Sequence, residues 1–80
     1  MEKILTLEFN KQAEFIELHF NKEGAEYLKN ILTKLIENDE EEHVHLMTPD
    51  WGGNELDAKQ QNTSNDFKLI HQLKIMYWKE

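Results

Sequence analysis

The sequence predicts an α+β fold, a two-layer sandwich of ββαββ order in which a four-stranded, mainly antiparallel sheet carries one helix on one face. Two pairs of segments alternate between apolar and polar residues, which is the period of a β-strand, and between the pairs apolar residues recur at helical spacing. One helix stripe and one apolar sheet face are what the chain has to bury. Because a chain of 80 residues buries only about 60% of its unfolded surface, we expect residues 1–80 to form a single domain.

Residues 4–9 and 15–20 form the first predicted pair of strands. In each segment apolar side chains occupy every second position, so one face of the strand is apolar and the other is wet. Asn10 begins the polar segment NKQAE that joins them, and so short a link favours an antiparallel hairpin. The apolar face consists of Leu5, Leu7, Phe9, Ile16, Leu18 and Phe20, and the wet face includes Thr6 and Glu8.

Residues 22–37 form the predicted helix. Asn21 precedes it and can accept hydrogen bonds from the first free amides, while Glu23 favours the positive end of the helix dipole. Gly24 in the first turn is a mild cost to the helix, and we expect Asn38 to end it in the left-handed conformation. The apolar stripe consists of Ala25, Leu28, Ile31, Leu32, Leu35 and Ile36.

The C-terminal half contains two further predicted strands, residues 43–47 and 67–78, separated by a long polar connection over residues 48–66. A connection of this length in a small domain is either functional or mobile. Neither face of the last strand is cleanly polar, so the second face of the sheet would carry apolar groups that a monomer usually covers. We therefore expect either a loop over this face or a homodimer through it. Its apolar residues are Phe15, Ile70, Met76 and Trp78.

Composition predicts a soluble protein of a reducing compartment, and the cytoplasm is the expected location. The chain has no cysteine, and no apolar run approaches the roughly 20 residues of a membrane span. The N-terminal segment MEKILTLEFNKQ has too short an apolar run for a signal peptide. Nine lysines, no arginine and sixteen acids give a net charge of −7, which argues against nucleic-acid binding.

Histidine and aspartate side chains are the candidates for a metal or catalytic site. His43 and His45 project to one side of a strand, and with His71 or Asp50 they could offer ligands to zinc. Two histidines do not fix a third ligand, so strand residues paired with carboxylates are the preferred interpretation. No Ser-His-Asp, Cys-His or phosphate-loop pattern can be assembled. We expect no catalytic residue, metal or cofactor, and a small metal-binding or hydrolytic domain that uses these histidines stays open as an alternative.

An acidic run follows the predicted helix, where the helix dipole already disfavours negative charge. A solvated linker explains such a run without any function, and this is the preferred interpretation. The alternative is an acidic patch that meets a basic surface. The run comprises Glu37, Asp39, Glu40, Glu41 and Glu42.

The stretch HLMTPDWGGNEL contains a shaped turn. Pro49 fixes a backbone angle and favours an extended Thr48, and the two glycines permit left-handed or close-approach geometry. Trp51 at the centre of the turn either folds back to seal the second sheet face, against Trp78 and Ile70, or stands out as an aromatic anchor for a partner. From physics alone the seal is preferred, because an indole left in water on a loop is rarely without consequence.

This stretch, together with the final segment KLIHQLKIMYW, resembles the immunity protein 32 family, small bacterial proteins predicted to neutralise toxins of polymorphic toxin systems. The residues fit the family's pattern His-Leu-Met-Thr-Pro-x-Trp-Gly-Gly-x-x-Leu and its closing Ile-His-x-x-Lys-Ile strand with an aromatic pair. The resemblance is close in the C-terminal half and extends to the N-terminal half only in the order of elements. As a structural motif it comprises His45, Thr48, Pro49, Gly52, Gly53, Leu56, His71 and Trp78.

The resemblance implies a binding protein without a catalytic step, whose partner is a cognate toxin such as a nuclease or another enzyme with a basic active-site cleft. The negative net charge agrees with such a partner. In that mechanism Glu40, Glu41 and Glu42 steer the encounter, while Asp50 and Trp51 dock on the toxin. A structural homodimer with no activity of its own is a further alternative, and it is compatible with toxin binding.

Overall fold

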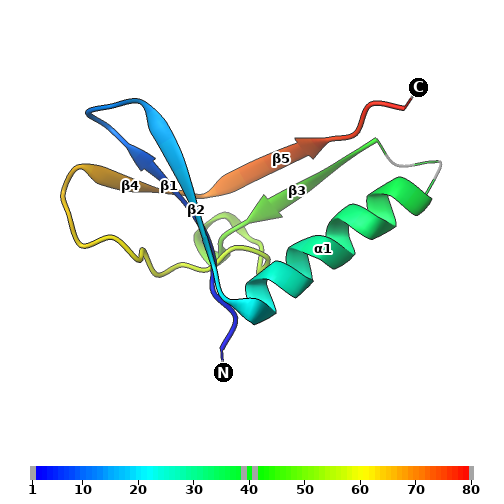
Figure 1. Cartoon of the computed structure of the whole chain (residues 1–80), viewed down its shortest axis with the longest axis horizontal. Coiled ribbons are helices and arrows are strands. Elements are labelled where there is room, and N and C mark those ends of the chain that lie inside the picture. Colours follow the sequence, from blue (N-terminus) through cyan, green and yellow to red (C-terminus); the bar gives the residue numbers. More distant parts are fainter. Residues whose placement is uncertain (1, 39, 41, 80) are drawn as a thin grey trace.

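The computed structural model describes residues 2–38, 40 and 42–79. These residues form an α+β fold with one α-helix, one short 3-10 helix and five strands (Figure 1). No helix within the described ranges is long and apolar enough to cross a membrane. The elements in chain order are β1 (Leu5–Asn10), β2 (Phe15–Phe20), α1 (Lys22–Glu37), β3 (His43–Met47), η1 (Pro49–Trp51), β4 (Phe67–Ile70) and β5 (Gln72–Met76).

The strands form two small antiparallel sheets, not the single four-stranded sheet that the sequence predicts. One sheet has the order β2-β1-β4, and the other pairs β3 with β5. The predicted last strand, residues 67–78, is in fact two strands that meet at His71 and pair with different partners (Figure 1). The prediction is therefore correct in its α+β class, whereas the structure has five strands in two sheets in place of four strands in one.

The loop after β3 explains the break at His71. β4 pairs with β1 in a register that aligns Leu7 with Ile70. A continuous strand would then align Leu5 with Gln72. Asp57 occupies that place instead, because its amide donates to the Leu5 carbonyl at 2.9 Å and its Oδ2 accepts from the Leu5 amide at 2.7 Å. The chain therefore leaves β1 at this point, and β5 pairs with β3.

The break also changes which side chains face the core. Ile70 of β4 and both Leu73 and Ile75 of β5 pack against the core cluster, which a single alternating strand does not allow. The prediction that Ile70 lies on the second sheet face is therefore wrong. The other residues predicted for that face, Phe15, Met76 and Trp78, are exposed.

The first hairpin forms as predicted, and its turn is organised by one side chain. The Asn10 Oδ1 accepts from the amides of Gln12 and Ala13 at 2.9 and 2.8 Å, and the Asn10 carbonyl accepts from the Glu14 amide at 3.1 Å. Glu14 then adopts a φ of 56°, in the left-handed region that favours glycine. This residue returns the chain into β2.

The helix occupies the predicted residues. The Asn21 Oδ1 accepts from the amides of both Gly24 and Ile4 at 2.9 Å, so one side chain caps the helix and ties its start to the strand that precedes β1. The prediction that Asn38 is left-handed is wrong, because its φ is −98°. Its side chain accepts from the Glu40 amide at 3.0 Å instead.

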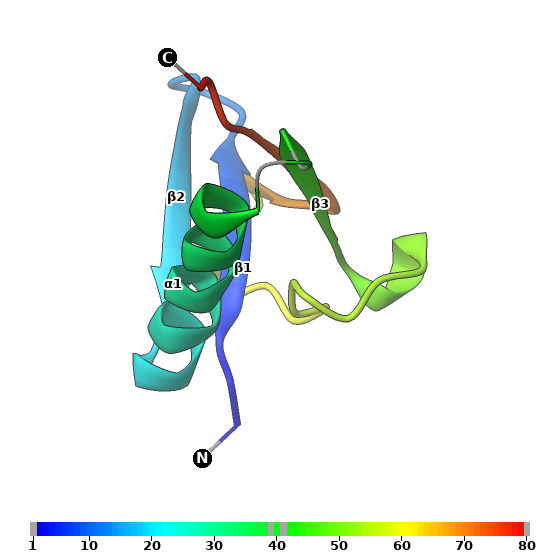
Figure 2. The same ribbon diagram turned by 90° about the vertical axis from the view of Figure 1, so that its right-hand side faces the viewer.

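The core lies between the helix and the two sheets. Figure 2 shows α1 in front of β1, with β2 on one side and β3 on the other. Tyr27, Leu28 and Ile31 of the helix pack against a cluster of buried leucines, each of which contributes roughly 2 kcal/mol by leaving water. One of these leucines comes from the loop after η1, so the long connection is part of the core. The cluster consists of Leu5, Leu7, Leu46 and Leu56.

Candidate functional site

The turn after β3 has a defined backbone. Thr48 is extended, with φ −76° and ψ 163°, and its carbonyl accepts from the amides of Trp51 and Gly53 at 3.0 Å. Gly52 adopts a φ of 91°, in the left-handed region. A Cβ on Gly53 would lie 2.6 Å from the Met47 carbonyl oxygen, so glycine is needed there for close approach. Gly52 thus supplies the left-handed geometry and Gly53 the close approach that the sequence predicts.

Two hydrogen bonds join this turn to the break between β4 and β5. The Thr48 Oγ1, in a fully buried side chain, lies 2.7 Å from Nδ1 of His71, and the Thr48 amide donates to the His71 carbonyl at 3.0 Å. The Trp51 indole stacks on the same imidazole, with 5.6 Å between ring centroids and 9° between the ring planes. The indole of Trp51 is therefore positioned by the imidazole of His71, which Thr48 holds in place.

Trp51 does not seal the second sheet face against Trp78. Its side chain is 58% exposed and Trp78 is 83% exposed. Asp50 beside it is also exposed. A shallow hollow of about 320 Å³ adjoins the indole, and its lining residues are Trp51, Lys68, Leu69, Ile70, His71 and Gln72. The turn therefore presents an exposed aromatic ring, a carboxylate and an open hollow side by side.

The acidic run and the turn lie at opposite ends of β3. Glu40 and Glu42 are exposed, and the Glu42 carbonyl accepts from the Tyr77 amide at 2.7 Å. Asp39 and Glu41 lie outside the described residues. The five residues of β3 lie between Glu42 and Thr48, so these two residues are about 20 Å apart, since a strand rises about 3.3 Å per residue. The two predicted contact regions therefore do not form one compact site.

The histidines proposed for a metal site are not brought together. The rings of His43 and His45 meet edge to face with 5.1 Å between centroids, and both side chains are exposed on β3. His71 is held by Thr48 and Trp51 at the other end of the strand. Among the described residues, no group of three or more His, Cys, Asp or Glu side chains could hold a metal ion.

A buried polar cluster was missed by the sequence reasoning, which placed Thr6 and Glu8 on a wet face. Both side chains are fully buried. The Glu8 carboxylate accepts from the Thr6 hydroxyl at 2.7 Å, from the Gln61 amide at 2.8 Å and from the amide and side chain of Asn62 at 3.0 and 2.8 Å. The polar loop over residues 57–66 covers this face of the sheet and supplies most of the donors.

The electrostatics of the cluster are governed by these donors. Burial by itself raises the pKa of Glu8, but the hydrogen bonds from Gln61, Thr6 and Asn62 outweigh it and lower the pKa to about 2. The pKa of the half-buried Glu17 is also lowered, by its hydrogen bonds to Asn62 and then to His19. The distance from the His19 Nε2 to the Glu17 Oε1 is 2.9 Å. The sequence shows Glu8 only as a polar residue in an alternating strand. Nothing near it in the chain indicates that residues 61 and 62 return to cover it.

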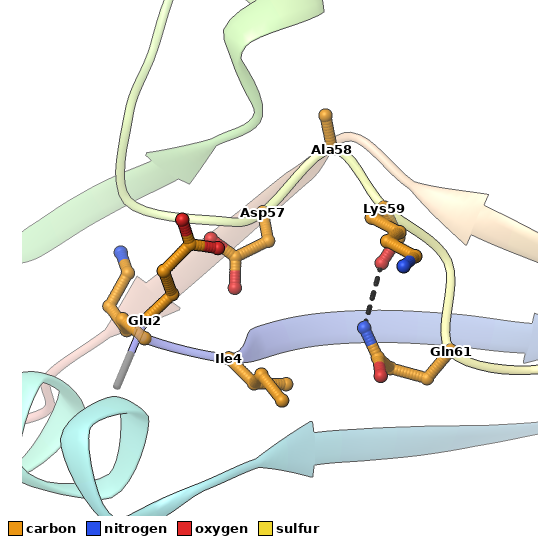
Figure 3. A pocket seen from close by; sticks show the side chains of 7 residues that line it. Glu2, Ile4, Asp57, Ala58, Lys59 and Gln61 are labelled. Carbon is orange, nitrogen blue, oxygen red and sulfur yellow. Dashed lines mark hydrogen bonds between the residues drawn. The ribbon is translucent and has the colours of Figure 1, made fainter.

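Another hollow, of about 510 Å³, lies near the N-terminus. Figure 3 shows that the N-terminal segment supplies Glu2 and Ile4 to it, while the loop after η1 supplies Asp57, Lys59 and Gln61. Its polar groups are largely engaged in structure, because Asp57 bonds to the Leu5 backbone and the Gln61 side chain donates to the Lys59 carbonyl at 3.1 Å. The arrangement connects the loop to β1.

Comparison with known proteins assigns the chain to a family. Neither a curated protein nor a solved structure matches it. The model of one family, described as Immunity protein 32, matches residues 16–73, which is more than half of the chain and includes the turn, its supporting histidine and the helix. The chain therefore belongs to the Immunity protein 32 family.

Proposed function

We propose that this protein binds a cognate bacterial toxin and neutralises it, with no catalytic step of its own. Membership of the Immunity protein 32 family is the observation that carries the proposal. The exposed, supported Trp51 supplies a surface suited to the task, since tryptophan is among the residues that most often dominate the affinity of protein interfaces. We place the encounter with the toxin in the cytoplasm.

Trp51 is the proposed anchor, and Asp50 is the polar contact beside it. The indole already rests on His71, and His71 is fixed by the buried Thr48, so little side-chain freedom remains to be lost on binding. An apolar group of the toxin would enter the hollow next to the indole. The carboxylate of Asp50 is exposed beside this contact and would pair with a basic group of the toxin.

The acidic run has a separate task in this proposal. Glu40, Glu41 and Glu42 steer a basic toxin surface toward the protein, helped by the net charge of −7. The distance between this run and the turn means that steering and docking involve two regions at opposite ends of β3. Changes at the two ends should therefore affect different rate constants.

The test is to mix the purified protein with the product of the gene immediately upstream of its own, and to measure both Kd and loss of toxicity. We expect tight binding that abolishes toxicity. Trp51→Ala should raise Kd by about 30-fold, as expected for the loss of an interface anchor. Trp78→Ala is the matched control, because it removes a still more exposed tryptophan at the far end of β5 and should leave Kd nearly unchanged.

The steering residues are tested by association kinetics. The double change Glu40→Gln with Glu42→Gln should lower the association rate several-fold and leave the dissociation rate unchanged. The control, Glu14→Gln with Glu26→Gln, removes the same charge from exposed positions elsewhere. Absence of both binding and rescue would contradict the proposed function for this pair. Stoichiometric zinc in protein prepared without chelator would instead favour the metal-binding alternative.

A further inference from the structure

We propose that the free edge of β2 pairs with β2 of a second copy of this chain, antiparallel, with a two-fold axis through Leu18. The result is a homodimer with a continuous sheet of order β4-β1-β2-β2-β1-β4. This surface differs from the second sheet face for which the sequence predicted a dimer. The inference does not rest on the toxin-binding proposal, because it uses neither the turn nor the acidic run.

The helix leaves the apolar face of β2 largely uncovered. Ile16, Leu18 and Phe20 are 59%, 42% and 56% exposed, although they lie on the same face of the sheet as the helix. Leu32 and Ile36 of the helix are also exposed. An apolar groove of about 290 Å³ runs along the helix and reaches the last residue of β2, and its lining residues are Phe20, Ala25, Leu28, Lys29, Leu32, Thr33 and Ile36. Contiguous apolar surface of this kind usually marks an interface.

The edge of β2 is open as well as apolar. Within the part of the chain that the structure describes, β2 pairs with β1 alone. Edge strands are normally protected by charged side chains, above all lysine, by proline or by a bulge. β2, with the sequence FIELHF, has no lysine or proline, and its one acid, Glu17, is bonded to His19 and Asn62. The strand also pairs with β1 residue for residue along its whole length. It is therefore a straight template for another strand.

The hydrogen bonds around β1 identify which backbone groups reach this edge. The Asn21 amide donates to the Ile4 carbonyl at 3.2 Å. Because every second residue of an antiparallel strand bonds to its partner, the residues of β2 that bond to β1 are His19, Glu17 and Phe15. The backbone of Leu5, which lies opposite Phe20, bonds to Asp57 on the far side of β1. Phe20 therefore makes no ladder bond to β1, as this alternation requires. The amides and carbonyls that point outward are therefore those of Ile16, Leu18 and Phe20.

These outward groups select one register. With Leu18 on the two-fold axis, Leu18 faces Leu18, and Ile16 of each copy faces Phe20 of the other. Every outward amide and carbonyl of these residues then meets a partner. A shift by one residue would align outward groups with groups already bonded to β1. The apolar side chains also stay on one face, next to the two helices.

The opposite face of the sheet favours the same register. Glu17 of each copy lies opposite His19 of the other, so each carboxylate, which already lies 2.9 Å from His19 of its own chain, also faces an imidazole of the second copy. A shift by two residues would place Glu17 opposite Glu17 or His19 opposite His19, which pairs like groups. This complementarity of the strand with itself is the reason to assign the edge to a second copy and not to a strand of another protein.

The dimer leaves the turn accessible. In Figure 2, β2 lies at the left edge of the molecule and the turn that contains η1 lies at the right edge. A two-fold axis beside β2 therefore places the two Trp51 side chains on outer surfaces. Each copy carries a charge of −7, so the two repel at long range, and association should be measured at about 0.15 M salt, where the screening length is about 8 Å.

The first test is the mass in solution, measured by light scattering over a range of concentrations. We expect a dimer at tens of micromolar protein. Leu18→Lys places two ammonium groups on the axis and should raise the dimer dissociation constant at least 30-fold. Met76→Lys is the matched control, because it changes another half-exposed apolar residue outside this edge and should leave the dimer intact. A monomeric wild-type protein, or a dimer that Leu18→Lys does not weaken, would overturn the proposal.

The second test fixes the register and does not depend on the folding of Leu18→Lys. The chain has no cysteine, so each introduced thiol is unique. Leu18→Cys should form a disulfide-linked dimer on mild oxidation, because hydrogen-bonded partners lie about 5.5 Å apart at Cα, within disulfide range. Ile16→Cys and Phe20→Cys should each stay uncrosslinked alone and should crosslink when mixed. Crosslinking of either one alone, or none in the mixture, would exclude this register and with it the proposal.

Discussion

The Thr48 hydroxyl lies 2.7 Å from Nδ1 of His71, and the backbones of the same two residues are joined by a 3.0 Å hydrogen bond. Thr48 begins the turn that carries Trp51, and His71 stands where the last predicted strand breaks into β4 and β5. The two segments in which the chain resembles its family therefore meet at this half-buried pair of residues. The position of Trp51 depends on it, because the indole stacks on that imidazole.

Thr48→Val should destabilise the protein by about 1–2 kcal/mol. Valine keeps the shape of the side chain but leaves Nδ1 of His71 without its buried partner. Thr48→Ser keeps the hydroxyl, so its free energy of unfolding should fall clearly less than that of Thr48→Val. Urea unfolding measures the stability, and Trp51 fluorescence in a Trp78→Phe background reports whether the indole still rests on the imidazole. Equal stability of the Val and Ser variants would show that the hydroxyl contributes nothing.

Glu8→Gln should destabilise the protein by about 3 kcal/mol at neutral pH. The pKa of Glu8 is lowered from 4.5 to about 2, and one unit of pKa corresponds to about 1.4 kcal/mol. Glutamine also turns an amide group toward the donors of Gln61 and Asn62. Because the pKa in the folded protein is the lower one, this stabilisation is complete above pH 4.5 and is lost as the pH falls toward 2.

The pH dependence is the sharper measurement for Glu8. Between pH 5 and pH 2.5 the free energy of unfolding of the wild type should fall toward that of Glu8→Gln. Glu26→Gln on the exposed side of the helix is the control and should follow the wild-type profile. If the free energies of unfolding of the wild type and Glu8→Gln differ by a constant amount down to pH 2.5, the charge of Glu8 does not stabilise the protein as proposed.

Local features of the sequence were sufficient for the helix and the first hairpin. The cap at Asn21, the helical spacing of apolar residues and the alternation in residues 4–9 and 15–20 each depend on neighbours in the chain. The turn could also be predicted, since Pro49 fixes a backbone angle and the two glycines permit conformations that other residues avoid. The position of Trp51 could not be predicted, because its stacking partner His71 lies 20 residues away in sequence.

The remaining features depend on where the long polar connection runs. Asp57 takes the place beside Leu5 that a continuous last strand would occupy, and this divides the sheet. The same loop brings Asn62 to Glu8 and turns a predicted wet face into a buried one. Loop paths of this kind are decided by side-chain contacts across more than 50 residues, and neither alternation nor propensity carries that information. The partner-binding roles of Trp51 and the acidic run stay predictions.

Gly24→Ala should destabilise the protein although alanine is the better helix former. A Cβ at this position would collide with the Ile4 carbonyl oxygen, which is part of the connection between the helix and the strand before β1. The gain of about 1 kcal/mol in helix propensity should therefore be outweighed. Asn30→Ala on the exposed side of the same helix is the control and should stabilise slightly. Thermal unfolding of both variants measures the comparison, and a stabilised Gly24→Ala would show that the helix start can move away from Ile4.

Glu14→Gly should stabilise the first hairpin by about 0.5–1 kcal/mol. Glu14 has a φ of 56°, a conformation that costs an L-residue roughly 1–2 kcal/mol and costs glycine almost nothing, although the greater freedom of glycine in the unfolded chain removes part of the gain. Ala13→Gly is the matched control, because the adjacent exposed residue does not have a positive φ and should lose stability on the same change. Urea unfolding of the two variants measures the sign directly. Opposite signs are expected, and a loss in both would mean that the Asn10 cap holds the turn at no cost to Glu14.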